Sequence, residues 1–141
     1  MNDDLMTVIK RAVTGWPGVT IGDTGRGGLQ FTYGRVEIGH LHGGSCADLP
    51  FPKKVRDALI ATGQAAVHPP LPHSGWVRRG MNGPADAEAV VALFRLNYDR
   101  AKARDEQRAA RQGDALGGGG RRLDSIGATG DLVTAQRKDI L

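Results

Sequence analysis

The sequence has a single cysteine, Cys46, among 141 residues, and aromatic residues make up only 5% of it. One cysteine excludes an intramolecular disulfide and a cysteine-rich zinc site. No apolar run approaches the roughly 18 residues that a membrane span needs. The acidic start, Met1 to Asp4, lacks the basic and apolar segments of a secretory signal. These absences predict a cytoplasmic protein with no membrane partner.

The length of 141 residues fits one small domain, and that domain carries a modest positive charge. Nineteen Lys and Arg residues against fifteen Asp and Glu residues give a net charge of +4 at pH 7. Residues 113–141 hold equal numbers of basic and acidic side chains, so the positive excess belongs to residues 1–112. This excess aids solubility and is too small by itself to indicate a nucleic-acid partner.

Glycine is abundant, with 21 residues, and four consecutive glycines occupy positions 117–120. Ordering such a run costs much backbone entropy. We therefore predict a folded domain over residues 1–112 and a flexible, glycine-rich tail over residues 113–141.

Hydrophobic periodicity and turn residues predict an α+β fold in which a small antiparallel sheet packs against helices. The clearest element is a hairpin, in which strands 29–33 and 36–42 flank a Gly34-Arg35 turn. The other predicted elements are a helix at 3–14, a strand at 19–21, a loop at 43–52, a helix at 53–62, short strands at 65–68 and 76–78, and a helix from Ala85 to about Gln112.

His40 and His42 alternate along the predicted strand 36–42 and therefore point to one side, roughly 6.6 Å apart. Strict alternation places Ile38 on the same face and Glu37 on the opposite one. Joined by His68 or His73, the pair could bind a divalent metal or perform acid–base chemistry. Structural histidines are the third alternative. The sequence requires no cofactor, and a divalent metal stays open.

Other polar residues near the histidines have both a functional and a structural interpretation. Asp48 could orient a histidine through a ring N–H, or serve as a turn or cap residue. Trp76 could form the apolar wall of a ligand pocket or lie in the core. Ser74 lacks the Gly-x-Ser-x-Gly frame of a nucleophile elbow. The glycines between Gly22 and Gly28 lack the spacing of a phosphate-binding loop and predict a mobile turn.

Four segments, Trp16–Val19, Glu37–Gly43, Ala47–Arg56 and Leu71–Val77, resemble the luciferase-domain family over about residues 5–102. This family contains small bacterial proteins and is related to fungal luciferase, which oxygenates a hydroxylated pyrone with molecular oxygen. The resemblance implies a site with these polar positions: the catalytic candidates His40, His42 and Asp48, and the ligand-binding candidates Arg56, His68, Ser74 and Trp76.

The order of the predicted elements is also similar to that of MmcQ/YjbR-type double-wing proteins, a fold often described as DNA-binding-like. This second resemblance lies in the pattern of helices and strands. It implies a nucleic-acid-binding module as an alternative function, although a fold alone does not establish a function.

The leading prediction is small-molecule binding, or cofactor-free oxidative or acid–base chemistry, on an aromatic or enolic ligand in a histidine-lined pocket. A histidine would be the general base and Arg56 would pair with the resulting anion. Two alternatives stay open. One is an interaction scaffold whose tail recruits a partner, and the other is a nucleic-acid module that contacts phosphates through Lys10, Arg11, Lys53, Lys54 and Arg56.

Overall fold

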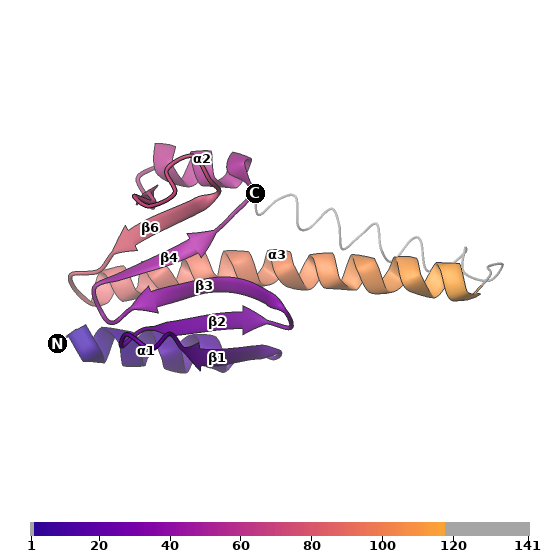
Figure 1. Cartoon of the computed structure of the whole chain (residues 1–141), viewed down its shortest axis with the longest axis horizontal. Helices are drawn as coiled ribbons and strands as arrows, with labels where there is room; N and C mark the ends of the chain where they lie inside the picture. Colours follow the sequence, from indigo (N-terminus) through magenta and orange to yellow (C-terminus); the bar gives the residue numbers. More distant parts are fainter. Residues whose placement is uncertain (1, 118–141) are drawn as a thin grey trace. The chain divides into compact units, whose positions relative to one another are not determined.

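The computed structural model describes residues 2–117 (Figure 1). The chain divides into two units between Lys102 and Ala103. The first unit contains the sheet. Most of the predicted tail, residues 118–141, lies outside the described residues. Within residues 2–117, no helix combines the length and the apolarity that crossing a bilayer requires.

The chain forms a six-stranded antiparallel sheet and three helices, so the predicted α+β class is confirmed. The strand order across the sheet is β1-β2-β3-β4-β6-β5. The elements are α1 (Asn2–Thr14), β1 (Val19–Asp23), β2 (Leu29–Tyr33), β3 (Val36–His42), β4 (Cys46–Pro50), α2 (Lys53–Ala61), β5 (Ala66–Val67), β6 (Trp76–Gly80) and α3 (Pro84–Gly117).

The predicted loop at 43–52 is wrong, because residues Cys46–Pro50 form strand β4 in the middle of the sheet. Asp48 and the two nearby prolines gave this segment a low strand propensity. Pairing with β3 on one side and β6 on the other overrides that local preference. Asp48 is thus a central strand residue, and the alternative of a turn or cap residue does not hold.

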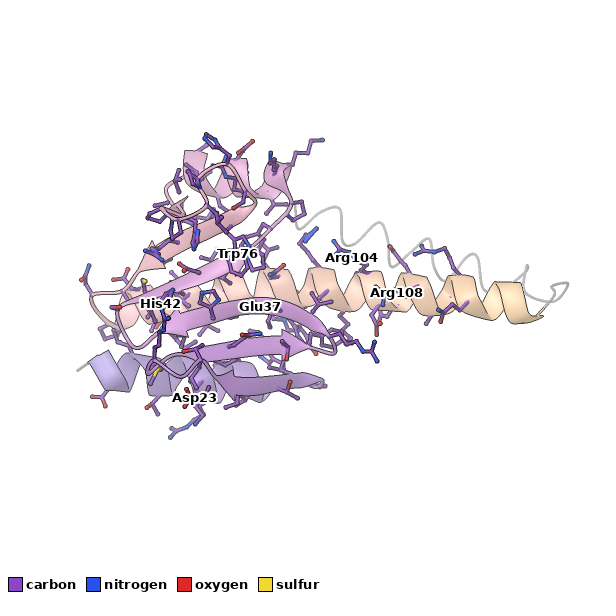
Figure 2. The ribbon with its side chains drawn as sticks, in the orientation of Figure 1. Asp23, Glu37, His42, Trp76, Arg104 and Arg108 are labelled. Carbon is purple, nitrogen blue, oxygen red and sulfur yellow. The ribbon has the colours of Figure 1, made fainter. Side chains whose placement is uncertain are left out.

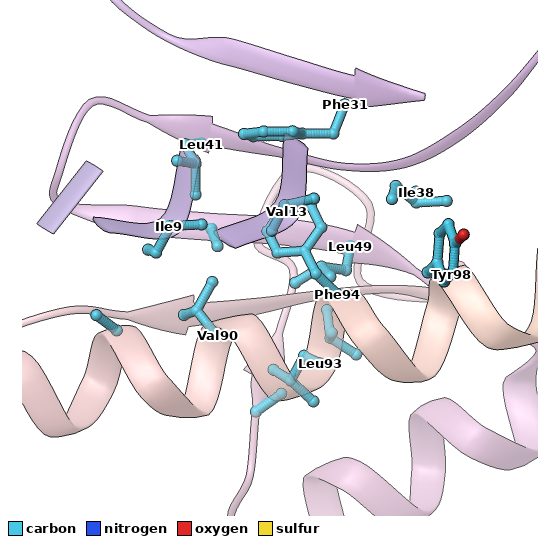
Figure 3. Close-up of a cluster of buried hydrophobic side chains, with 14 of the residues drawn as sticks. Ile9, Val13, Phe31, Ile38, Leu41, Leu49, Val90, Leu93, Phe94 and Tyr98 are labelled. Carbon is cyan, nitrogen blue, oxygen red and sulfur yellow. The ribbon is translucent and has the colours of Figure 1, made fainter. Parts of the chain in front are cut away.

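The hydrophobic core lies between one face of the sheet and the helices α1 and α3 (Figure 3). Phe31 of β2 meets Phe94 of α3 edge to face, with ring centroids 5.0 Å apart. Tyr98 of α3 packs against Trp16 and Tyr33 and donates a hydrogen bond to the Pro17 carbonyl. The largest fully buried aliphatic side chains of this layer are Ile9, Val13, Ile38, Leu41, Leu49, Val77 and Val90.

A β-bulge interrupts the pairing of β2 with β3. Thr32 pairs with Glu37 and Phe31 pairs with Gly39, so Ile38 is the extra residue. Gly39 has φ +151°, and a Cβ at this position would lie 2.7 Å from the Phe94 ring. The side-chain amide of the buried Asn97 donates to the Ile38 carbonyl at 3.0 Å. Glycine and Asn97 together hold the bulge in place.

The bulge overturns the predicted assignment of faces along β3. Strict alternation placed Ile38 with the histidines and Glu37 on the opposite face. The extra residue inverts the alternation, so Ile38 and Leu41 both enter the core. Glu37 and His40 come to the same side, where they contact each other. A bulge changes which face the following side chains occupy, and strand periodicity alone does not reveal it.

Candidate functional site

The face of the sheet opposite the core carries a cluster of polar side chains on its middle strands. His40 of β3 stands directly across from Asp48 of β4, which stands across from Arg78 of β6. Figure 2 shows Glu37 and His42 on β3 and Trp76 on β6. Cross-strand pairing therefore brings together residues from distant parts of the chain.

The Asp48 carboxylate is the centre of this cluster and is fully buried by its partners. The Arg78 guanidinium donates from Nε to Oδ1 at 2.7 Å and from Nη2 to Oδ2 at 2.9 Å. His42 and His68 each donate from Nε2 to Oδ2, at 2.7 and 3.0 Å. A buried carboxylate needs this many donors, because burying an unpaired charge costs several kcal/mol.

His40 lies between two carboxylates. Its Nδ1 donates to Glu37 Oε2 at 2.7 Å, and its Nε2 lies 3.4 Å from Asp48 Oδ2. Interaction with Asp48 and then with Glu37 raises the pKa of His40 to about 9, against the opposing effect of burial. His40 is therefore an imidazolium at neutral pH.

The charges of the cluster balance one another. Burial tends to raise the pKa of the Asp48 carboxyl, but hydrogen bonds from Arg78 and the neighbouring imidazoles outweigh burial and hold that pKa well below its usual range. The same hydrogen bond raises the pKa of the Arg78 guanidinium. Two cations, Arg78 and His40, thus face two carboxylates, Asp48 and Glu37.

His42 differs from the other histidines of the cluster because its side chain is 48% exposed. Its Nε2 hydrogen is fixed on Asp48, so in the neutral ring Nδ1 carries the lone pair. No hydrogen bond from another residue in 2–117 engages that Nδ1. Neutral His42 therefore has the form of a general base whose orientation a carboxylate sets.

His42 and His40 line an open groove of about 580 Å³. This volume lies within the range of small-molecule sites, about 300–1,000 Å³. The groove runs from β3 to the loop between β1 and β2. Its lining residues are Thr24, Arg26, Gly28, Gln30, Glu37, His40, His42 and Gly43.

The structure brings most, but not all, of the predicted site residues together. Trp76 packs on His40 and His68, with ring centroids 5.3 and 5.8 Å apart, and so walls one side of the cluster. His73 is exposed and makes none of the cluster's contacts.

Two predicted ligand-binding residues have structural partners outside the cluster. Ser74 donates to the Leu71 carbonyl and accepts from the Trp76 N–H, which closes the turn before β6. Arg56 donates to the Pro72 carbonyl and to Asp57. Neither is among the residues that line the groove, and their ligand-binding roles stay predictions.

Sequence reasoning missed Arg78 and misplaced Glu37, the two groups that balance the cluster's charge. A signal for Arg78 was available, because an aspartate flanked by apolar residues needs a nearby cation once it is buried. The bulge at Ile38 hid Glu37. Arg26 and Gln30 also escaped notice, since the groove that they line depends on how the β1–β2 loop folds back over β3.

His40, His42 and Asp48 are also of the right type to hold a divalent metal. Their candidate ligand atoms lie within 4.8 Å of one another, and two imidazoles with a carboxylate suit zinc or a similar ion. Two observations favour a hydrogen-bonded cluster over a bound metal ion at this position. Hydrogen bonds already occupy the lone pairs of Asp48, and the Arg78 charge lies against the same carboxylate.

The model of the luciferase domain matches residues 35–97, from the start of β3 into α3. This match supports the similarity of residues 35–97 to the luciferase-domain family. The match includes every member of the polar cluster, whereas Arg26 and Gln30 of the groove precede it. No curated protein and no solved structure matches the chain. The similarity to double-wing proteins stays a prediction.

Proposed function

We propose that this luciferase domain binds a small aromatic or enolic molecule in the groove and that His42 removes a proton from it. The supporting observation is the arrangement of His42 itself. Its Nε2 hydrogen is held by the buried Asp48 carboxylate, and its half-exposed ring lines the groove. A carboxylate in this position keeps the base in the correct tautomer and stabilises the imidazolium that forms.

The proposed step is a simple proton transfer. The O–H bond of a phenol or enol breaks, the proton moves to Nδ1 of His42, and the electron pair stays on the oxygen. The cluster then carries one extra positive charge, which the ligand anion balances. The His40 imidazolium, whose ring lies 5.0 Å from that of His42, adds positive charge beside the developing anion.

Trp76 supports this step by shielding the cluster. Its indole packs on His40 and His68 and so limits water on that side of Asp48. Fewer water molecules mean a lower local dielectric, and interactions between charges are stronger there. We assign Trp76 a positioning role.

The family resemblance adds an oxidative continuation. A deprotonated enol is electron-rich, and fungal luciferase oxygenates such a substrate with molecular oxygen. For this domain we propose binding and deprotonation as the function of the cluster, and oxygenation as the reaction class to test next. We also keep the predicted cytoplasmic location as part of the proposal.

A chromogenic phenol tests the proposal directly. Para-nitrophenol turns yellow when it loses its proton, so the absorbance of nitrophenolate reports proton transfer on binding. At a pH below the pKa of the free phenol, we expect the protein to induce this band and His42→Gln to abolish it. His73→Gln is the matched control, because His73 is an exposed histidine outside the cluster. A band that persists in correctly folded His42→Gln protein would refute the proposal.

Chelation separates proton chemistry from metal chemistry in the same assay. If His42 acts as described, the nitrophenolate band survives treatment with a chelator and dialysis. A band that disappears with chelation and returns with zinc would assign the cluster to metal binding instead.

The nucleic-acid alternative gains little from the placement of its basic residues. Lys10 and Arg11 lie on α1, which contacts β1 at one edge of the sheet. Lys53 and Lys54 lie on α2, which contacts β5 and β6 at the other edge. A nucleic acid would have to span the sheet to meet both groups. A gel shift that is strong at low salt and falls steeply with added salt would favour this alternative.

A further inference from the structure

The loop between β1 and β2 is closed on itself and pressed against β3. The Asp23 carboxylate accepts the Gly25 N–H at 2.6 Å, and the Thr24 N–H donates to the Gly28 carbonyl at 3.2 Å. Gly28 is buried, and any side chain there would clash with the Leu41 carbonyl. The loop therefore lies beside the strand that carries the histidines and forms the far wall of the groove.

Arg26 occupies the tip of this loop. Gly25 and Gly27 flank it with φ values of +86° and +77°, which favour glycine over residues with a side chain. Arg26 is exposed, and no carboxylate in residues 2–117 forms an ion pair with it. The other cations of the site, Arg78 and His40, are each held by a carboxylate. Arg26 is thus the uncompensated cation among the residues that line the groove.

We propose that Arg26 binds a carboxylate of the ligand, so that the groove takes a phenolic or enolic carboxylic acid. This inference rests on the proposed function, because it places the phenol or enol at His42 and the carboxylate at the opposite wall. A planar guanidinium matches a carboxylate with two parallel hydrogen bonds. One uncompensated cation also matches the single charge of a carboxylate better than the double charge of a phosphate.

Two related probes test the inference. The first is 4-hydroxy-3-nitrobenzoate, a chromogenic phenol with a carboxylate across the ring. The second is 4-methyl-2-nitrophenol, which has a neutral methyl group in place of that carboxylate. We expect Arg26→Gln to weaken binding of the benzoate by about tenfold, as for loss of a charge-assisted hydrogen bond. Binding of the methyl probe should not change.

Two variants control for charge and for geometry. Arg35→Gln removes the same charge from the exposed β2–β3 turn, outside the groove, and should leave both affinities unchanged. Arg26→Lys keeps the charge and loses the planar fork, so we expect a smaller loss for the benzoate. Circular dichroism confirms that each variant is folded.

The outcomes separate this inference from the proposed function. Equal effects of Arg26→Gln on both probes, or no effect on either, would overturn the carboxylate assignment. Tighter, Arg26-dependent binding of nitrophenyl phosphate would also overturn it, in favour of a phosphate. If the benzoate binds through Arg26 but never shows the phenolate band, the carboxylate site stands and proton transfer by His42 fails.

Discussion

The two faces of strands β3 and β4 are stabilised in different ways. On the core face, Ile38, Leu41 and Leu49 are buried among apolar neighbours, and their contribution scales with the area removed from water. On the other face, Asp48 is equally buried, but directional hydrogen bonds to particular partners keep it there. A residue on the core face can be exchanged for one of similar volume, whereas Asp48 is tied to its donors.

The largest effect should come from removing the cation that faces Asp48. We expect Arg78→Leu to lower the free energy of unfolding by about 3–5 kcal/mol, because it leaves a buried carboxylate without its main partner. Urea denaturation followed by circular dichroism measures this. The double variant Asp48→Leu/Arg78→Leu should be more stable than the single variant, since it removes the unpaired charge. A single variant within about 1 kcal/mol of the parent would contradict the account.

A substitution that creates a cavity on the core face tests whether the two faces are stabilised independently. We expect Leu49→Ala to cost about 3 kcal/mol in the free energy of unfolding, as for other fully buried leucines. In folded Leu49→Ala protein, the nitrophenolate band should persist, because the donors to Asp48 remain. Loss of that band at temperatures where the variant is fully folded would show that the two faces are energetically coupled.

Raising the pH should weaken only the polar face. His40 has a folded-state pKa of about 9 against an ordinary value of 6.5. Its contribution to stability is therefore complete below pH 6.5 and is lost as the pH rises through 9. We expect the free energy of unfolding to fall by about 2 kcal/mol over this window, after allowing for solvent screening at a partly exposed ring. The decline should be absent in His40→Gln; an equal decline in both proteins would exclude His40 as its source.

The smallest effect in this series concerns the bulge that separates the two faces. Asn97→Leu leaves the buried Ile38 carbonyl without its donor, at an expected cost of about 1–2 kcal/mol. Because Glu37 and His40 depend on the bulge to meet, the pH-dependent part of the stability should also shrink. Chemical denaturation at neutral and at alkaline pH measures both effects. Glu88→Leu, a substitution at an exposed position of the same helix, serves as the control and should change neither.

Local patterns in the sequence predicted the elements whose conformation is set locally. The hairpin followed from the alternation of 29–33 and from the Gly34 turn, and the helices followed from their apolar stripes. Strand β4 could not be predicted in this way, because its residues favour a strand only after β3 and β6 flank them. The bulge also depends on a distant partner, since Asn97 lies 59 residues after Ile38.

The same distinction between local and distant determinants applies to the candidate site. His40 and His42 were recognisable because their spacing is local, and Asp48 was recognisable as a group able to orient them. The charge partners of these residues were not recognisable from the sequence. Glu37 needed the bulge, and Arg78 needed a sheet pairing over a separation of 30 residues. Sequence alone indicated three side chains at the centre of the cluster, and only the fold shows how its charges are balanced.

The Asp48–Arg78 pair also has a consequence for how the chain assembles. Asp48 leaves the ribosome 30 residues before Arg78, and until then its carboxylate has no guanidinium to neutralise it. Pairing β4 with β3 before β6 would offer the carboxylate His40 and His42 but not the Arg78 guanidinium, and burial without that partner would cost several kcal/mol. We therefore expect Asp48 to become fully buried only once β6 has paired with β4. The buried charge of Asp48 thus bears on how the sheet assembles as well as on the chemistry of its polar face.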